Sequence, residues 1–236
     1  MFKLSRKGEQ VQQMFGAIAP RYDFLNRLLS LGIDQRWRRF AIKQVKWSEG
    51  GTVLDVATGT GDVALTIAAA TPPSVKIVGL DFCKEMIDLG VEKVRKSPYA
   101  ERITMGVAPC ESIPYPDGSF DSVTIAFGIR NVVDRRLGLA EMLRVLKPGG
   151  RAVILEFSTP KSAIFRKLYH FYFLKILPFI GGLLSDFSAY KYLPDSVLEF
   201  PSQEEFSRMM KDVGFTNVDH HDLTGGIATV YVGEKG

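Results

Sequence analysis

The sequence is poor in cysteine and histidine, which limits the kinds of site it can build. Cys83 and Cys110 are the only cysteines among its 236 residues, so a disulfide scaffold is excluded and a reducing compartment, the cytoplasm, is expected. The three histidines, His170, His220 and His221, have no cysteine or acidic partner at the spacing of zinc ligands. We therefore expect no metal site.

Long apolar runs are also missing. Charged residues interrupt the best candidate for a membrane span, residues 164–184, and Pro178 breaks it, which excludes a transmembrane helix. The first seven residues carry charges with no apolar stretch behind them, so we expect no secretory signal.

A strong charge of one sign is the third absence. Basic residues number 30 and acidic residues 26, which gives a net charge of +4. This balance most simply reflects a solvated surface with a few surplus basic side chains. It permits contact with an anionic membrane or with nucleic acid but favours neither. A hydrophobic fraction of 46% and a charged fraction of 24% exclude disorder as the dominant state.

What the sequence does have is a regular alternation of short apolar runs and helical patterns over residues 52–158. This alternation predicts an α/β fold with a doubly wound, mostly parallel, seven-stranded sheet, which binds ligands beyond the carboxyl ends of its strands.

The length suits one domain, with N-terminal helices over 1–48, an aromatic insertion over 159–200 and a helix and hairpin over 201–236. About two residues around Gly225-Gly226 are expected to close that hairpin. Strands are predicted at 52–56, 75–80, 103–107, 122–127, 151–157, 216–221 and 227–232, and helices at 62–70, 84–95, 135–146 and 203–213.

A glycine-rich loop follows the first predicted strand. Gly59, Gly61 and Ala64 satisfy the G-x-G-x-x-G/A pattern, and Asp81 ends the next strand, where a ribose-binding acid belongs. A tight turn without a ligand is the alternative. Because the loop lies between a strand and a helix, the pattern favours a nucleotide-type cofactor.

Charges around this loop favour S-adenosylmethionine over a dinucleotide. Asp62 can cap the helix that starts there and Asp55 lies just behind it, so two carboxylates would face a pyrophosphate and repel it. S-adenosylmethionine has no phosphate, and its sulfonium and α-ammonium groups suit an acidic loop. We therefore expect S-adenosylmethionine as the cofactor, with its ribose hydroxyls on Asp81.

Later motifs point to a known family. Residues 120–123 (FDSV) open the fourth strand, and Pro148-Gly149-Gly150 is typical of a tight turn back into the sheet. Over residues 50–158 the sequence resembles the class I S-adenosylmethionine-dependent methyltransferases. Nearly the whole chain resembles the ubiquinone/menaquinone biosynthesis C-methyltransferases. The stretches that carry this resemblance are YDFLNRLLS (22–30), FGIRNV (127–132), RVLKPGGR (144–151) and LEFS (155–158).

The resemblance implies methylation of a ring carbon in a polyprenylated quinol: demethylmenaquinol, a 2-methoxy-6-polyprenyl-1,4-benzoquinol, or both. The sequence departs from the family at Asp34, where His is frequent, at Ala126, where Ser is frequent, and at Pro109-Cys110, where Asn-Ala or Asp-Ala is common. Pro109 offers no N–H, so adenine recognition would rely on other backbone groups. The expected cofactor site comprises Asp55, Thr58, Gly59, Thr60, Gly61, Asp81, Phe82, Pro109, Cys110 and Ala126.

Three residues are expected to act on the acceptor. A quinol ring carbon becomes nucleophilic when a neighbouring hydroxyl loses its proton, so a positioned base is needed. Arg130 and Asn131 follow the fourth strand, and we expect Arg130 to favour the quinolate and Asn131 to orient a ring oxygen or a water. The alternatives are an ion pair of Arg130 with a structural carboxylate and a capping role for Asn131. Tyr22 is the third candidate, and the alternative to a functional role is packing. For Asp34, the alternative to a functional role is the N-cap of a helix.

Residues 160–200 are unusually aromatic, and apolar side chains from Phe165 to Ile180 cover nearly every helical face. This pattern favours one of two roles and disfavours an ordinary core helix. The segment is expected to form a lid that covers an isoprenoid tail, or a surface that contacts the inner face of the membrane. Asp186, Tyr190 and Tyr192 would complete the pocket.

Other classes of function stay open at this point. A methyltransferase of another small molecule or of nucleic acid would share the cofactor loop. No base-stacking box follows the fourth strand, however, and no dense basic run is present, so we expect no nucleic-acid partner. The intact loop and the family-like Arg130-Asn131 argue against a non-enzymatic binding module. A homo-oligomer is compatible with the sequence.

Overall fold

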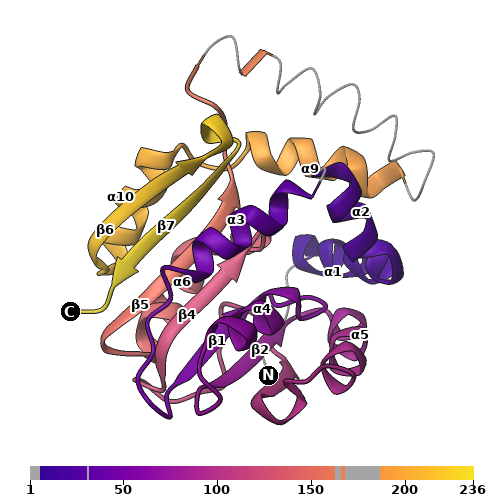
Figure 1. Ribbon diagram of the computed structural model, residues 1–236. Coiled ribbons are helices and arrows are strands. Elements are labelled where there is room, and N and C mark those ends of the chain that lie inside the picture. The colour runs from indigo at the N-terminus through magenta and orange to yellow at the C-terminus, as the bar shows by residue number, and fades with distance from the viewer. Residues whose placement is uncertain (1–5, 31, 163–165, 168–186) are drawn as a thin grey trace.

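A computed structural model describes residues 6–30, 32–162, 166–167 and 187–236 (Figure 1). Most of the aromatic stretch from Phe165 to Ile180 lies outside these ranges, as do Asp186 and the side chain of Tyr190. The expected lid therefore stays a prediction.

The described residues contain the expected seven-stranded, doubly wound sheet, in the order β3-β2-β1-β4-β5-β7-β6. Strands β1 to β5 run parallel, and β7 is antiparallel to both of its neighbours. The strand order reverses between β1 and β4, and this is the switch point where such sheets bind ligands. The strands are β1 (Thr52–Val56), β2 (Lys76–Asp81), β3 (Ile103–Val107), β4 (Phe120–Ala126), β5 (Leu146–Phe157), β6 (Thr216–Leu223) and β7 (Ala228–Glu234).

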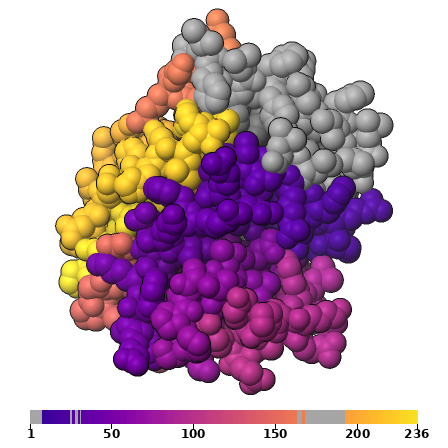
Figure 2. Space-filling model, in the orientation of Figure 1, coloured from indigo at the N-terminus to yellow at the C-terminus, as the bar shows by residue number. Residues whose placement is uncertain are grey.

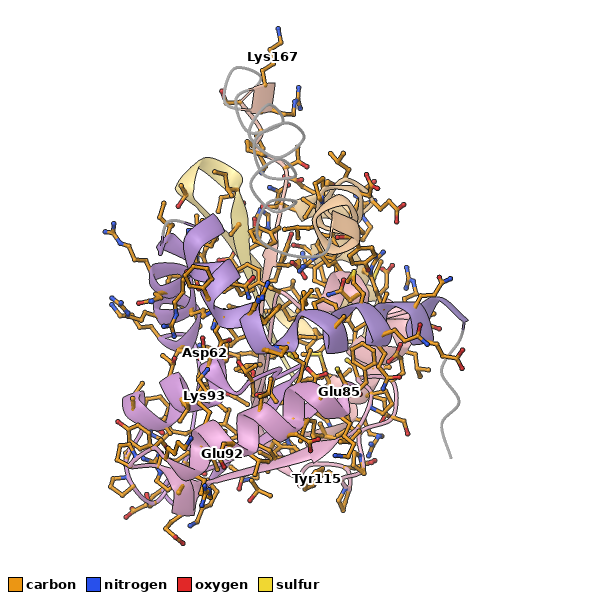
Figure 3. The ribbon with its side chains drawn as sticks, turned by 90° about the vertical axis from the view of Figure 1, so that its right-hand side faces the viewer. Asp62, Glu85, Glu92, Lys93, Tyr115 and Lys167 are labelled. Carbon is orange, nitrogen blue, oxygen red and sulfur yellow. The ribbon has the colours of Figure 1, made fainter. Side chains whose placement is uncertain are left out.

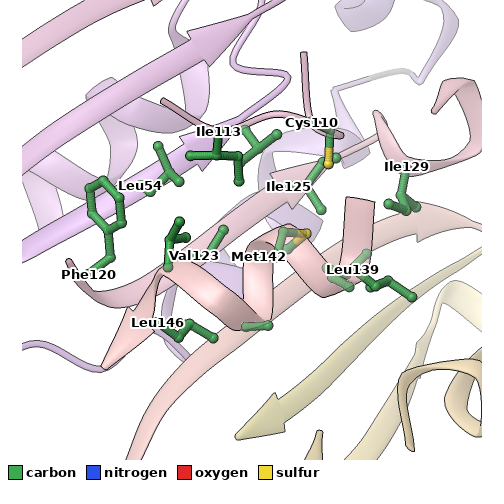
Figure 4. Close-up of a cluster of buried hydrophobic side chains, with 14 of the residues drawn as sticks. Leu54, Cys110, Ile113, Phe120, Val123, Ile125, Ile129, Leu139, Met142 and Leu146 are labelled. Carbon is green, nitrogen blue, oxygen red and sulfur yellow. The ribbon is translucent and has the colours of Figure 1, made fainter. Parts of the chain in front are cut away.

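Helices cover both faces of the sheet. The neighbours Val53 and Leu54 are both fully buried, in two different apolar cores, because a parallel strand covered on both faces is apolar throughout. Helices α3, α4 and α5 pack around Val53, and α6 and α10 pack around Leu54 (Figure 4). These helices are α3 (Ile33–Ile42), α4 (Asp62–Ala70), α5 (Lys84–Arg95), α6 (Arg135–Val145) and α10 (Gln203–Val213).

Three short elements precede α3, and one helix precedes α10. Pro20 ends the first run because proline is tolerated only in the first turn of a helix. Gly32, with φ of 75°, starts α3, so the N-cap role expected as an alternative for Asp34 is wrong. Asp34 lies inside the first turn and accepts a hydrogen bond from Ser30 Oγ at 2.6 Å. The elements are α1 (Arg6–Ile18), η1 (Ala19–Arg21), α2 (Tyr22–Leu29) and α9 (Phe187–Leu198).

Two turns differ from the sequence prediction. Four residues, not two, join β6 to β7, because Thr224 and Gly225 both take left-handed conformations in a 3-10 turn, η5 (Thr224–Gly226). Strand β5 begins at Leu146, so the Pro-Gly-Gly sequence lies inside the strand. A register shift between Phe120 and Ser122 accommodates the extra residues.

None of the helices within the described ranges is long and apolar enough to cross a membrane.

Candidate functional site

The turns after β1 and β4 meet at the carboxyl edge of the sheet. Ala57, after β1, has φ of 51°, and Phe127, after β4, has φ of 57°. Non-glycine residues rarely adopt this left-handed conformation, and they do so mainly at ligand and active sites. A Cβ atom at Gly128 would lie 2.6 Å from Ala57 Cβ, so only glycine lets the two turns approach this closely.

A pocket opens at this edge of the sheet, where doubly wound folds bind their ligands. Turns after β1, β2, β3 and β4 form its walls, and Gly8 of α1 contributes to the lining. Four predicted site residues meet here: Phe82, Pro109, Cys110 and Asn131. The other lining residues are Ala57, Ala108, Glu111, Gly128, Val132 and Val133.

Cys110 lies where the pocket adjoins the apolar core (Figure 4). A Cβ atom at Gly138 of α6 would lie 2.9 Å from Cys110 Sγ, so the helix leaves space for the thiol. Burial raises the pKa of this thiol far above its usual value, so it remains protonated and serves as an apolar wall. The adjacent Glu111 accepts the N–H of Val133 at 3.0 Å and ties this wall to the segment that follows β4.

Asp55 lies beneath the glycine loop and does not line the pocket. Its two oxygens accept hydrogen bonds from Thr58 Oγ1 and Thr124 Oγ1, each at 2.6 Å, and it is 1% exposed. Burial raises its pKa to about 6 against the effect of both hydroxyls. The structure thus gives this carboxylate a direct role in shaping the loop.

Asp81 occupies the corresponding place after β2. Its oxygens accept the N–H groups of Gly59 at 2.9 Å and of Cys83 at 2.8 Å. Burial raises its pKa to about 6 as well. Asp81 lies next to Phe82, which lines the pocket, and a carboxylate has lone pairs left to accept further hydroxyls.

Cations neutralise the acidic end of the loop, and this corrects the charge argument made from the sequence. Asp62 caps no backbone N–H; it contacts Lys93 of α5 (Figure 3) and Arg38 of α3, the latter at 3.0 Å. Burial raises the pKa of Asp62, but the hydrogen bond and charge of Lys93, with the charge of Arg38, lower it below its usual value. The carboxylate of Asp62 is therefore paired with cations and does not stand free at the start of α4, so its charge alone does not select the cofactor.

Helix α2 lies against the same loop. Thr60 Oγ1 donates to Asp23 Oδ1 at 2.6 Å, and Lys93 Nζ donates to Asp23 Oδ2 at 2.6 Å. The N-terminal helices are thereby fastened to the glycine loop, a contact that the sequence analysis missed.

Arg130 is buried in an ion pair. Its Nη1 lies 2.8 Å from Glu156 Oε1 and 2.5 Å from the carbonyl oxygen of Phe127, and its backbone N–H donates to Glu156 Oε2 at 3.2 Å. Glu156 is fully buried and Arg130 is 7% exposed. This is the arrangement given above as the alternative to a catalytic role.

Asn131 reaches the pocket and has a partner that sequence reasoning did not assign to it. Tyr192 of α9 donates its hydroxyl to Asn131 Oδ1 at 2.9 Å. The Nδ2 atom of Asn131 lies 3.5 Å from the carbonyl oxygen of Phe127. No helix-capping bond of the expected alternative is formed, since the cap of α6 is Asp134.

Tyr22 and Ala126 are also absent from the pocket lining. The ring of Tyr22 packs against Phe15, with ring centroids 6.0 Å apart. Burial raises the pKa of its hydroxyl against the effects of Asn26 and Arg130. Ala126 lines a smaller pocket on the side of α3 and α4.

A seven-stranded sheet whose antiparallel strand, β7, lies between β5 and the edge strand β6, with a glycine loop and a pocket at the switch point, defines the class I S-adenosylmethionine-dependent methyltransferases. Solved structures share the fold: a SAM-dependent methyltransferase from Thermotoga maritima, named as a possible histamine N-methyltransferase, superposes with a TM-score of 0.66 at 20% identity, covering 95% of this chain and 99% of that one.

Residues 3–235 match the model of the ubiE/COQ5 methyltransferase family. The chain is 73% identical, over the full length of both, to a ubiquinone/menaquinone biosynthesis C-methyltransferase of Geotalea uraniireducens. It is 50% identical to a demethylmenaquinone methyltransferase of Deinococcus radiodurans, over 97% of this chain and 94% of that one. The chain belongs to the ubiE/COQ5 methyltransferase family, and S-adenosylmethionine is its cofactor.

The pocket fits this cofactor. Apolar walls at Phe82, Pro109 and Val132 suit the adenine ring, and Asp81 lies beside them for a ribose. A Cβ atom at Gly59 would meet nothing within 4 Å, so the loop leaves open space above its backbone.

Proposed function

We propose that this chain transfers the methyl group of S-adenosylmethionine to a ring carbon of a prenylated quinol and converts demethylmenaquinol to menaquinol. The observation that carries the proposal is the full-length similarity to quinone C-methyltransferases, combined with a pocket at the switch point of the sheet. Methylation of a methoxy-benzoquinol in ubiquinone synthesis is a second acceptor reaction of the same type, favoured by the names of the relatives.

Three groups of residues are proposed to hold the cofactor. The glycine loop supplies backbone groups for its amino-acid end, Asp81 accepts the ribose hydroxyls, and the turn after β3 faces the adenine. The bound cofactor supplies an electrophilic methyl group. The proposed set is Asp55, Thr58, Gly59, Thr60, Gly61, Asp81, Phe82, Pro109 and Cys110, of which Asp55 and Thr58 act by shaping the loop. Ala126 lines a different pocket and is not part of this set.

At the acceptor, the chain has to align the ring carbon and exclude water. Asn131 reaches the pocket and is proposed to hold a ring oxygen. Arg130 is proposed to contribute through the turn that it fixes with Glu156, with its charge shared between that carboxylate and the site. Tyr22 is proposed to close the site from α2, as a hydroxyl that burial keeps protonated.

Two partner assignments go beyond the quinol. The prenylated acceptor is itself a membrane lipid, and we propose that the face formed by α2 and α3 contacts an anionic membrane surface, since exposed cations gather there. A homo-oligomer stays a prediction.

The test is incubation of the full chain with S-adenosylmethionine and chemically reduced demethylmenaquinol, followed by mass spectrometry. A parallel reaction contains the reduced methoxy-benzoquinol. A product heavier by one methylene is expected from demethylmenaquinol, because only the quinol can form the nucleophilic anion; the oxidised quinone serves as the control and should stay unchanged. No product from either quinol, with cofactor binding intact, would contradict the proposal and favour another small-molecule acceptor.

A further inference from the structure

Asn131 lies on a turn that the core holds rigidly. Both oxygens of the fully buried Glu156 bind Arg130, one through the guanidinium and one through the backbone N–H. The carbonyl oxygen of Phe127 accepts from the same guanidinium. These contacts tie the turn that carries Asn131 to the buried core, and the orientation of its side-chain amide depends on the partners of the amide itself.

Tyr192 and the carbonyl group of Phe127 fix that orientation together. The carbonyl oxygen can only accept, so it favours the NH₂ side of the amide, and the Tyr192 hydroxyl donates to Oδ1 on the other side at 2.9 Å. Burial raises the pKa of Tyr192 despite the nearby charges of Arg130 and Arg135, so the phenol stays protonated and remains a donor at neutral pH. The NH₂ group of Asn131 is thereby turned away from Tyr192.

The NH₂ group of Asn131, which faces away from Tyr192, is the part of the amide that can bind a ligand. Among the described residues, its one protein acceptor is the carbonyl oxygen of Phe127, at the long distance of 3.5 Å, and that oxygen also accepts from Arg130 at 2.5 Å. An amide NH₂ carries two hydrogens, so at least one is left for a ligand. In a pocket lined by Asn131, that hydrogen suits an anionic or carbonyl-like ring oxygen.

We propose that Tyr192 is a positioning residue of the methyl-acceptor site, which orients the amide of Asn131 so that its NH₂ group donates to an oxygen of the acceptor ring. This rests on the proposed quinol methylation. Because Tyr192 belongs to α9, and α9 contacts both α1 and η3 (Ile129–Asn131), the acceptor site is complete only when the C-terminal part of the chain is seated on the core.

The matched test compares Tyr192→Phe with Tyr115→Phe. The first removes only the donor hydroxyl. The second removes a hydroxyl at the opposite end of the sheet, where Tyr115 packs on Phe120 at the start of β4. We expect Tyr192→Phe to lower kcat by about 3- to 10-fold, the effect of one neutral hydrogen bond, with a melting temperature lowered by no more than about 2–4 °C and unchanged affinity for S-adenosylmethionine measured by calorimetry. Tyr115→Phe should leave all three quantities unchanged.

A double-mutant cycle separates positioning from a general structural effect. If Tyr192 acts through Asn131, then Asn131→Ala and the Asn131→Ala, Tyr192→Phe double variant have the same kcat. Multiplying effects, or a Tyr192→Phe variant as fast as the unmodified chain, would overturn the inference while leaving quinol methylation standing.

A measurement independent of turnover keeps the inference testable if no quinol is methylated. In ¹⁵N-labelled protein, the side-chain NH₂ signals of Asn131 are assigned by their loss in Asn131→Ala. Tyr192→Phe should shift these signals, and Tyr115→Phe should not. Unshifted signals in Tyr192→Phe would show that the contact does not orient the amide.

Discussion

At the scale of single residues, the buried carboxylates of Asp55 and Asp81 have similarly raised pKa values but different hydrogen-bond partners. Asp55 binds two threonine hydroxyls beneath the loop, whereas Asp81 binds two backbone N–H groups beside the pocket. Burial raises the pKa of each to about 6. A raised pKa marks either a functional acid or a structural one, so the partners, and not the shift, have to decide between the two.

The pH dependence of stability should reveal the cost of burying these charges. The folded chain holds both protons up to about pH 6, whereas the unfolded chain releases them near pH 4. Between those values the folded state binds more protons, so the free energy of unfolding falls as pH rises and levels off above pH 6. For each group the full effect is at most about 3 kcal/mol. Asp55→Asn should lose its share of this slope in denaturant titrations at pH 4.5 and 7.5. A variant whose slope equals that of the unmodified chain would contradict the assignment.

Binding of the cofactor should distinguish the same two residues. Asp81→Asn removes the acceptor proposed for the ribose hydroxyls, and hydrogen bonds to charged groups contribute about 1.5–3 kcal/mol. We expect calorimetry to show S-adenosylmethionine affinity lowered more than tenfold in Asp81→Asn and by less than about threefold in Asp55→Asn. Equal losses in both variants would mean that the loop, and not the ribose contact, governs binding.

At the scale of elements, the N-terminal helices are held on the cofactor loop by charge. Lys93 of α5 contacts both Asp23 of α2 and Asp62 of α4. Without Lys93, the carboxylates of Asp23 and Asp62 would face each other. Arg38 and Arg27 would then be the remaining cations near Asp62. The side chain of Lys93 is 31% exposed, so solvent weakens but does not abolish this linkage.

Lys93→Met should therefore loosen α2 from the glycine loop. We expect faster hydrogen exchange across α1 and α2 and weaker binding of S-adenosylmethionine, with a loss of stability of about 1–2 kcal/mol. The matched control is Lys84→Met on the same helix, since Lys84 pairs with Asp88 at an exposed position. Exchange in α1 and α2 that is unchanged in Lys93→Met, or equally faster in both variants, would show that the linkage does not hold these helices.

Local sequence patterns predicted most of the helices and strands, but they did not predict contacts between residues that are distant in the sequence. Helices α4, α5 and α10 match their predicted ranges because caps and breakers lie next to them in sequence, such as Ser202 with Glu205 at the start of α10. The η5 turn was missed because Thr224 adopts a left-handed conformation that its residue type does not indicate. Asn131 and Tyr192 were each expected at the pocket, but 61 residues separate them, and nothing in the sequence pairs the two.

The charge argument for the cofactor shows the same limit. Asp55 and Asp62 are acidic in the sequence, but the fold gives the first to hydroxyls and the second to Lys93 and Arg38. S-adenosylmethionine was predicted correctly because the family motifs are specific. The electrostatic reason offered beside them was wrong, because partners 31 and 24 residues away neutralise Asp62.

At the scale of the whole molecule, the positive charge is concentrated in one segment. Residues 19–47 contain seven basic and two acidic residues, a balance of +5, against +4 for the entire chain. Both acids are engaged, Asp23 by Lys93 and Asp34 by Arg38. This segment crosses the middle of the face in Figure 2, and Phe24 within it is 61% exposed. Its exposed cations are Arg21, Arg27, Arg36, Arg39, Lys43 and Lys46, of which Lys46 pairs with Glu234.

Such a face suits an anionic lipid surface, where cations attract the headgroups and an exposed ring enters the boundary with the acyl chains. The substitution of Arg36 and Arg39 by Gln removes two charges that lie outside the contacts with the cofactor loop. Because each basic residue near an anionic membrane contributes about 1 kcal/mol, we expect binding to phosphatidylglycerol vesicles to weaken by about 30-fold in a sedimentation assay. Binding by the unmodified chain should also fall as salt rises.

The control for net charge is the double variant Lys84→Gln, Arg95→Gln. It loses the same two charges from α5, where both side chains are highly exposed, and it should bind vesicles as the unmodified chain does. Equal weakening in the two double variants would mean that net charge, and not the α2–α3 face, drives binding. The Arg36, Arg39 variant should also turn over a detergent-dispersed quinol at the rate of the unmodified chain, because neither substitution alters the pocket. Slower turnover of the same quinol in vesicles would then show that the substitutions affect delivery of the substrate.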